Sequence, residues 1–128
     1  MLPVGDTMMG SLFEKNEGGV KPMEECRVVP LDAYIVKHNL PVPSLMKIDI
    51  ECAEVQCLRG SVELIKKHSP ILIIEFHSLE LLKEGYAFLG PLGYTLTTEH
   101  GILDDDFLHT LHRFHSNVIC LPSRLGTG

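Results

Sequence analysis

Two short aliphatic runs constrain the fold of this chain more than any other feature. They cover residues 45–50 and 71–76, and each directly follows a proline-containing stretch. Runs this short and this apolar predict strands that are buried on both faces. The segment between them holds two helical stretches, 53–59 and 61–67, separated by Gly60. A strand, a helical crossover and a second strand form a βαβ unit, which is parallel and right-handed in nearly all cases.

Weaker patterns predict the remaining elements. Asp32 can cap a short helix that ends before a pair of prolines, and Ser78 can cap a longer helix over residues 79–89 with one apolar stripe. Residues 94–98 are rich in tyrosine and threonine, and residues 117–121 form an apolar run before a proline. We therefore expect two further strands after the βαβ unit.

The sequence predicts one folded domain with irregular ends. A length of 128 residues allows one ordinary domain. Residues 1–26 contain several glycines and prolines and have no sustained hydrophobic period, which is typical of an irregular arm. The folded domain is expected over residues 27–122, and residues 123–128 are expected to form a tail.

The composition argues against several classes of protein. Eleven lysines and arginines against seventeen aspartates and glutamates give a formal net charge of −6, which does not suit a nucleic-acid-binding surface. No apolar run approaches the roughly 18 residues that a membrane helix needs, and the first ten residues lack the pattern of a signal peptide. The four cysteines include no CxxC pair, so free thiols and a cytoplasmic setting are expected.

One motif in the βαβ unit has polar residues at fixed places within an apolar run. Residues 46–60 read MKIDIECAEVQCLRG, residues 69–77 read SPILIIEFH and residues 89–94 read LGPLGY. With the Leu-Asp pair at 31–32, these pieces resemble the carboxyl half of FkbM-type S-adenosylmethionine-dependent methyltransferases, whose middle piece typically reads like KIDVEGAE followed by Leu-x-Gly. NVICLP at 117–122 is similar to the family's closing strand. The residues in register with the middle piece are Lys47, Asp49, Glu51, Ala53, Glu54, Leu58 and Gly60.

The resemblance implies an α/β fold with a partial Rossmann-like sheet of the class I methyltransferase type. Such a sheet has parallel central strands, an antiparallel C-terminal strand and helices on both faces. It also implies S-adenosylmethionine as the cofactor. Cys52, however, stands where the family has a glycine, and this places a Cβ where the family keeps backbone room.

The resemblance does not extend to a cofactor-binding loop. No apolar strand followed by an Asp-x-Gly-x-x-x-Gly loop is present, and GDTMMG at residues 5–10 has no preceding apolar strand. The residues that would bind the cofactor are therefore not identified. We expect a truncated domain that contains the acceptor side of such an enzyme.

Four polar residues lie where the two strands of the βαβ unit end. Asp49 and Glu51 close the first strand, and Glu75 and His77 close the second. Ligands bind at the carboxyl ends of strands in open α/β sheets, and buried carboxylates are costly unless they are paired. In one interpretation these four are catalytic residues, and one of them acts as general base on an acceptor hydroxyl. In the other, Asp49 and Glu51 cap the helix that begins near residue 53.

Four further charged or polar residues favour structural roles. Glu54 lies in the first turn of the same predicted helix, where it suits the helix dipole and packing, and Lys47 can pair with one of the nearby acids. His38 and His68 lie near the ends of predicted helices, where a partial positive charge is favourable.

Two clusters invite a metal interpretation that the spacing does not favour. His109, His112 and His115 recur every three residues, and neither a helix nor a strand brings all three to one point at this spacing, so no metal site is expected. The acidic residues 104–106 are expected to form a solvated turn, because the spaced acids of a calcium loop are missing. The structure of residues 107–112 is left open.

Three functional hypotheses follow from these observations. The first is methyl transfer from S-adenosylmethionine to a hydroxyl of a small-molecule or glycan acceptor, with weak cofactor binding by this chain alone. The second is a non-catalytic interaction module, in which the bare edge of strand 45–50 pairs with a second copy or a partner chain, or is covered by the arm of residues 1–26. The third is that the sequence is a truncated reading of a longer gene.

Overall fold

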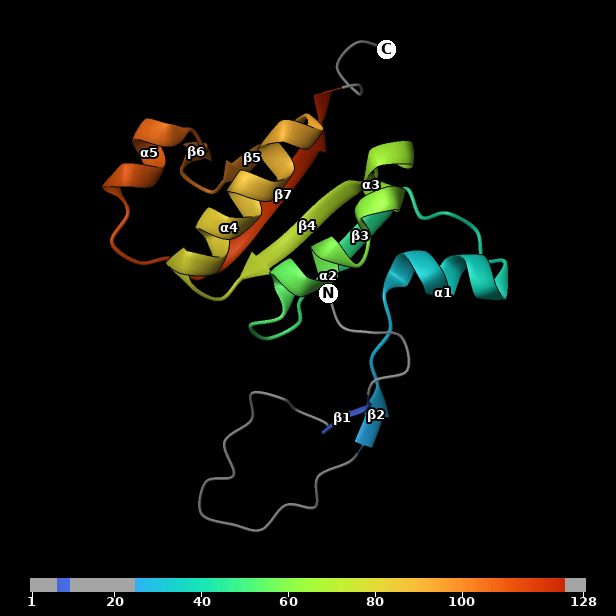
Figure 1. Cartoon of the computed structure of the whole chain (residues 1–128). Helices are drawn as coiled ribbons and strands as arrows, with labels where there is room; N and C mark the ends of the chain where they lie inside the picture. The colour runs from blue at the N-terminus through green and yellow to red at the C-terminus, as the bar shows by residue number, and fades with distance from the viewer. Residues whose placement is uncertain (1–6, 10–24, 124–128) are drawn as a thin grey trace, which may run out of the picture.

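The computed structural model describes residues 7–9 and 25–123 (Figure 1). Helices and strands alternate along most of this part of the chain. The elements in order are β1 (Thr7–Met9), β2 (Glu25–Arg27), α1 (Leu31–His38), β3 (Leu45–Ile48), α2 (Glu54–Arg59), α3 (Val62–His68), β4 (Ile71–Phe76), α4 (Leu79–Leu89), the 3₁₀ helix η1 (Gly90–Leu92), β5 (Tyr94–Thr98), β6 (Gly101–Ile102), α5 (Asp105–Thr110) and β7 (Ser116–Pro122).

The main sheet has five strands in the order β3-β4-β7-β5-β6. β3 and β4 pair in parallel, with Leu45 beside Ile71, so the predicted βαβ unit is confirmed. β7 lies between β4 and β5 and is antiparallel to both, which confirms the predicted antiparallel C-terminal strand. β3 is consequently an edge strand, and no described residue pairs with its outer side.

A second, two-stranded sheet forms within the segment that was expected to be irregular. β1 and β2 pair antiparallel, with Thr7 beside Arg27. The expectation of an irregular arm is therefore corrected at these two stretches. Residues 1–6, 10–24 and 124–128 lie outside the described residues, so only Thr7–Met9 of the GDTMMG segment at residues 5–10 is described.

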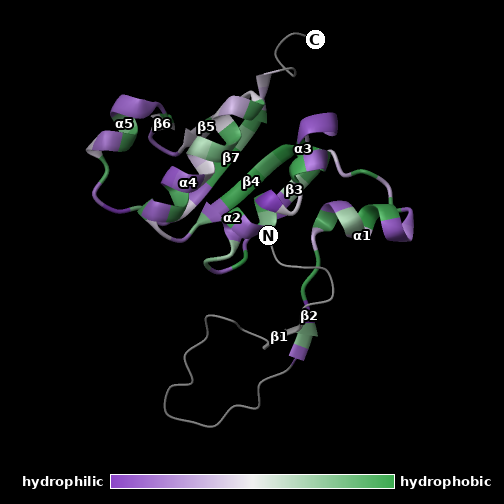
Figure 2. Cartoon of the chain, in the orientation of Figure 1, coloured by the Kyte–Doolittle hydropathy of each residue, from purple (hydrophilic) through white to green (hydrophobic). Residues whose placement is uncertain are grey.

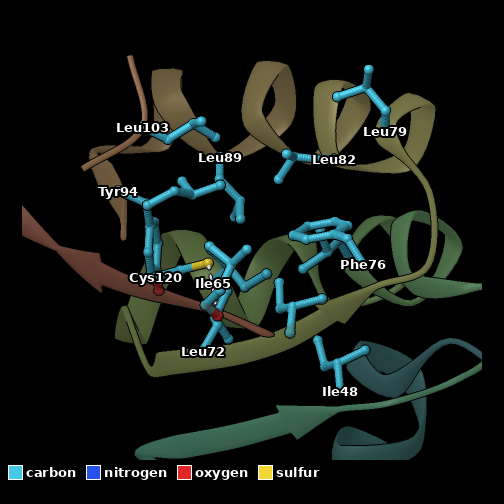
Figure 3. Close-up of a cluster of buried hydrophobic side chains, with 14 residues drawn as sticks. Ile48, Ile65, Leu72, Phe76, Leu79, Leu82, Leu89, Tyr94, Leu103 and Cys120 are labelled. Carbon is cyan, nitrogen blue, oxygen red and sulfur yellow. Dashed lines mark hydrogen bonds between the residues drawn. The ribbon is translucent and has the colours of Figure 1, made fainter. Parts of the chain in front are cut away.

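The hydrophobic core lies on one face of the five-stranded sheet. Along β4, Leu72, Ile74 and Phe76 are buried, whereas the residues between them are only partly covered. α2, α3 and α4 contribute Leu58, Ile65 and the leucines of α4 to the same cluster (Figure 3). In Figure 2, β4 is coloured as hydrophobic along most of its length, whereas α5 is mostly hydrophilic. We call this side of the sheet the packed face.

We call the opposite side of the sheet the open face. Two expectations about it are wrong. We expected helices on both faces, but α2, α3 and α4 all contribute to the one core cluster on the packed face. We also expected the strand at residues 45–50 to be buried on both faces, but Leu45 is 55% exposed and Ile48 alone is buried in β3. An apolar run reports what a strand can bury. It does not report whether a covering layer is present.

Asp32 does not cap its own helix. Its carboxylate accepts hydrogen bonds from the backbone N–H groups of Glu63 (2.8 Å) and Leu64 (3.0 Å), in the first turn of α3. α1 follows Pro30 and has no side-chain cap. Because Asp32 lies within the first turn of α1, its side chain is free to reach the neighbouring helix, and the two helices are joined by this cap.

α4 begins and packs as its sequence predicts. The Ser78 hydroxyl accepts a hydrogen bond from the backbone N–H of Leu81 (3.1 Å), which is the expected N-cap. Gly85 lies on the buried side of α4, directly against the ring of Phe76, and a Cβ at this position would run into that ring. No helix in the described part of the chain has the length and apolar character needed to cross a membrane.

Candidate functional site

The polar residues of the candidate site gather where β3 and β4 end and β7 begins. Asp49 directly follows β3, Glu75 lies in β4, and His77 follows that strand. β7 runs antiparallel to β4 with Phe76 opposite Ser116, so the residue before β7, His115, reaches the same edge. We call this cluster of Asp49, Glu54, Glu75, His77 and His115 the rim cluster.

Glu54 and His77 form the buried part of the rim cluster. The Glu54 side chain is 0% exposed, at the start of α2. Its Oε1 accepts a hydrogen bond from the backbone N–H of His77 (3.2 Å), and its Oε2 lies 3.3 Å from Nδ1 of the same residue. This second contact is a close charge contact whose alignment falls short of a hydrogen bond, and neither atom has another partner among the described residues.

The buried carboxylate of Glu54 favours one tautomer of the His77 imidazole. Leaving a carboxylate unpaired in the interior is costly, so a proton on Nδ1 directed at Glu54 is the favoured arrangement. Nε2 then carries the free lone pair. It lies 3.7 Å from Oε2 of Glu75 and 3.8 Å from Oδ1 of Asp49, on the outer side of the ring.

Glu75 and His115 form the outer part of the rim cluster. The His115 Nε2 atom lies 2.8 Å from Oε2 of Glu75, and the rings of His77 and His115 are 4.7 Å apart between centroids. The hydrogen bond from His115 is the main cause that lowers the pKa of the Glu75 carboxyl; desolvation opposes it, and the charges of His77, His115 and Lys47 lower the pKa further. Glu75 is therefore held as a carboxylate. Lys47 acts on it at a distance and forms no ion pair with the described acids.

Glu51 does not join the rim cluster. Its side chain is exposed, and no hydrogen bond or ion pair connects it to another described residue. Ala53 occupies the N-cap position of α2 without a side-chain hydrogen bond, so the capping interpretation of Asp49 and Glu51 is wrong. Of the four predicted site residues, Asp49, Glu75 and His77 are brought together and Glu51 is left outside.

Cys52, which stands where the family has a glycine, lies in the turn after β3. Cys52 is exposed and has a φ of 64°, which lies in the left-handed region that favours glycine. The resemblance places a glycine at this position. The turn is therefore built as the resemblance implies, but with a strained residue and a thiol in it.

The remaining histidines lie where the sequence favours structural roles, whereas the acidic residues 104–106 do not form the expected turn. His38 and His68 are the last residues of α1 and α3. His109 and His112 are exposed and do not join His115, so the three-histidine site is not formed. The acidic residues 104–106 begin α5 instead of forming a free turn, because the Asp104 carboxylate accepts a hydrogen bond from the N–H of Phe107 (2.8 Å).

A shallow cavity of about 380 Å³ adjoins the rim cluster. Its apolar lining comes from Phe107, Leu111 and Phe114, and Glu99 and Arg113 add charged groups. His115 belongs to both the cavity and the rim cluster. The cavity therefore offers a ligand a partly apolar surface that ends at the imidazole of His115.

Sequence reasoning missed two members of the rim cluster. Glu54 lies four residues before Leu58, so a helix places both on one buried face, and this spacing is a signal that was available. His115 could be placed in the rim cluster only from the register of β7 against β4, in which Phe76 lies opposite Ser116. No local pattern at residues 109–115 reports that register.

The comparisons with known proteins agree with the motif in the βαβ unit. A family model described as the methyltransferase FkbM domain matches residues 6–112. The match extends the resemblance toward the N-terminus, beyond the residues that first indicated it. A search of curated proteins gave no match, and a search of solved structures gave none either. With a family match over most of its length, the chain belongs to the FkbM methyltransferase domain family.

Proposed function

We propose that this chain provides the acceptor side of an S-adenosylmethionine-dependent O-methyltransferase and that His77 accepts the proton of the acceptor hydroxyl. The observation that supports the proposal best is the pair formed by Glu54 and His77. A half-buried imidazole fixed by a buried carboxylate, with its second nitrogen turned outward, is an arrangement suited to general base chemistry.

The chemistry requires such a base because a neutral hydroxyl is a weak nucleophile. In the proposal, Nε2 of His77 takes the proton as the acceptor oxygen attacks, and the Glu54 carboxylate stabilises the imidazolium that forms. Asp49 and Glu75, both within 4 Å of Nε2, add to that stabilisation. Glu51 has no part in this mechanism.

The cavity beside His115 supports a small-molecule or glycan acceptor with both apolar and polar parts. Phe107 and Phe114 would contact an apolar part or a sugar face, and Arg113 and Glu99 would bind hydroxyl or charged groups. The acceptor would extend from this cavity toward His77.

The family implies S-adenosylmethionine as methyl donor, but the described residues do not fit it. The turn after β3, where a glycine would leave room, carries the side chain of Cys52. Gly60 and Gly85 pack against Pro30 and Phe76, so they leave no room for a ligand there. The proposal is accordingly limited to the acceptor side of a truncated domain in a reducing, cytoplasmic setting.

Calorimetric titration of the chain with S-adenosylmethionine and S-adenosylhomocysteine tests this limit. We expect weak or no heat of binding, and low-micromolar affinity would show that the chain holds the cofactor after all.

The base itself is tested by ¹H–¹⁵N spectroscopy of the imidazole rings. We expect neutral His77 to carry its proton on Nδ1 and the Glu54→Gln variant to weaken this preference, because the amide removes the charge that fixes the proton. Glu51→Gln is the matched control and should leave the spectrum unchanged. A proton found on Nε2 in the unsubstituted chain would refute the role of His77 as base.

A second candidate function is self-association through the edge of β3. Leu45 is exposed there, and exposed apolar edge strands act as templates for pairing with another chain. Light scattering should detect a dimer that Leu45→Lys dissociates. Val36→Lys, in the exposed part of α1, is the control and should leave the dimer intact. A monomer in the unsubstituted chain would remove this candidate.

A further inference from the structure

We propose that Glu75, His77 and His115 form a binding site for a divalent transition metal ion such as Zn²⁺. The inference goes beyond the proposed function and does not depend on it. The three side chains come from two strand ends that are far apart in sequence, and one ligand atom from each lies within 4.8 Å of the others.

The distances between the ligand atoms suit a small metal ion. Zn²⁺ binds nitrogen and oxygen ligands at about 2.0 to 2.2 Å, so tetrahedral ligands lie about 3.3 Å from one another. Oε2 of Glu75 lies 2.8 Å from Nε2 of His115 and 3.7 Å from Nε2 of His77. The 2.8 Å distance would lengthen on rotation of the exposed His115 side chain, and the 3.7 Å distance would shorten on a small rotation of the Glu75 carboxylate.

Glu54 prepares His77 to act as a metal ligand. Histidines that bind metal ions almost always direct their other ring nitrogen to a carboxylate or carbonyl, which fixes the tautomer and raises the basicity of the ligand. The buried Oε2 of Glu54 lies 3.3 Å from Nδ1 of His77 and both atoms lack another partner among the described residues. A small rotation of the ring would align them as a carboxylate–histidine–metal unit requires.

The donor set selects the class of ion. Two imidazoles and one carboxylate favour Zn²⁺ and neighbouring transition metals, whereas Mg²⁺ and Ca²⁺ prefer oxygen ligands. Oδ1 of Asp49 lies 3.8 Å from Nε2 of His77 but outside the group of mutually close ligand atoms, so water would fill the fourth position unless the Asp49 side chain moves. The carboxylates of Asp49, Glu54 and Glu75 also supply negative charge for a cation.

Metal binding and proton transfer would compete for one atom. An ion on Nε2 of His77 occupies the lone pair that would accept a proton from an acceptor hydroxyl. The metal-bound form is therefore expected to be inactive in any reaction that uses His77 as base.

The test is titration of the full chain, first treated with a chelator, with Zn²⁺ by calorimetry and with Co²⁺ by visible absorption. We expect one ion per chain at micromolar affinity or tighter, and the absorption typical of tetrahedral Co²⁺. His115→Gln and His77→Gln should weaken binding at least 10-fold, and Glu54→Gln roughly 10-fold to 100-fold, as for other residues that position a ligand. His109→Gln and His112→Gln are the matched controls and should bind as the unsubstituted chain does.

Loss of binding through unfolding and binding of the ion by thiols can both be excluded. His115 is 59% exposed, so its substitution should leave the fold intact, which circular dichroism checks. Burial raises the pKa of Cys120 to about 12 and also raises that of Cys57, so the exposed Cys26 and Cys52 are the described thiols best able to compete for the ion. Alkylation of the exposed thiols before titration removes them. Binding that alkylation abolishes, or that survives in folded His115→Gln and His77→Gln, would overturn the proposal, as would absence of binding.

Discussion

The packed face and the open face of the main sheet are built from the same strands but under different constraints. On β7, Val118 and Cys120 are fully buried, whereas Ile119 and Leu121, which alternate with them, are 45% and 40% exposed. The exposed pair is at least as apolar as the buried pair. Hydrophobicity alone therefore does not define the core here. The helices that follow β3 and β4 define it, because they all pack on one side.

The largest effect should come from a methyl group added to the packed face. Gly85→Ala places a Cβ against the ring of Phe76, which is itself fully buried, so either the ring or α4 must move. We expect a loss of about 3 kcal/mol in the free energy of unfolding, measured by urea denaturation. Gly90→Ala, where no atom lies within 4 Å of the new Cβ, is the control and should change stability little. Equal stability of the two variants would contradict the close packing of α4 on β4.

Two neighbouring residues of β7 compare the faces directly. Val118→Thr buries a hydroxyl in the apolar core and should lower the free energy of unfolding by about 2 kcal/mol. Ile119→Thr, on the open face, should change it by about 0.5 kcal/mol or less. Both are read from the midpoint of thermal or urea unfolding. A large loss with Ile119→Thr would mean that the open face is covered in solution, by a second copy or by another part of the chain.

A smaller effect, of opposite sign, is expected in the turn after β3. Cys52 has a positive φ that costs a residue with a Cβ about 1 kcal/mol. Cys52→Gly should therefore raise the free energy of unfolding by about 0.5 kcal/mol, after the greater entropy of glycine in the unfolded chain is deducted. Cys52→Ala retains the strain and should give no gain. A destabilised glycine variant would show that the thiol makes a stabilising contact.

The smallest effect concerns Glu75 and His115, the outer part of the rim cluster. His115→Gln removes the hydrogen bond that contributes most to the lowered pKa of Glu75, so that pKa should rise toward its ordinary value of 4.5. Because the folded-state pKa is lowered, the associated stability is present at neutral pH and is lost as the pH falls through it. The carboxyl resonance of Glu75 followed by NMR during acid titration measures the shift. His112→Gln should leave it unchanged.

The sequence predicted the packed face well because its signals are local. The aliphatic run of β4, the break at Gly60 and the cap at Ser78 each depend on residues close in the chain. The open face was mispredicted because nothing within a strand reports whether a second layer covers it. Asp32 was mispredicted for a similar reason, since its partners lie 31 and 32 residues away.

The same distinction between local and long-range signals applies to the residues of the rim cluster. Asp49, Glu75 and His77 follow from the rule that parallel strands end at one edge, which needs only the βαβ unit. Glu54 required attention to the helix face that it shares with Leu58, and His115 required the register of an antiparallel strand. Long-range pairing therefore contributed His115, the one member of the rim cluster that lies outside the motif.

The cap that Asp32 provides has a consequence for local motion. α1 contributes no buried residue, so the two hydrogen bonds to α3, with the backbone hydrogen bond from Asp32 to Gly60, hold it in place. A segment with so little buried surface opens at low free energy. Hydrogen exchange in α1 should be fast and should rise together with exchange at the amides of Glu63 and Leu64. The chain thus contains a helix that can detach while the sheet stays folded.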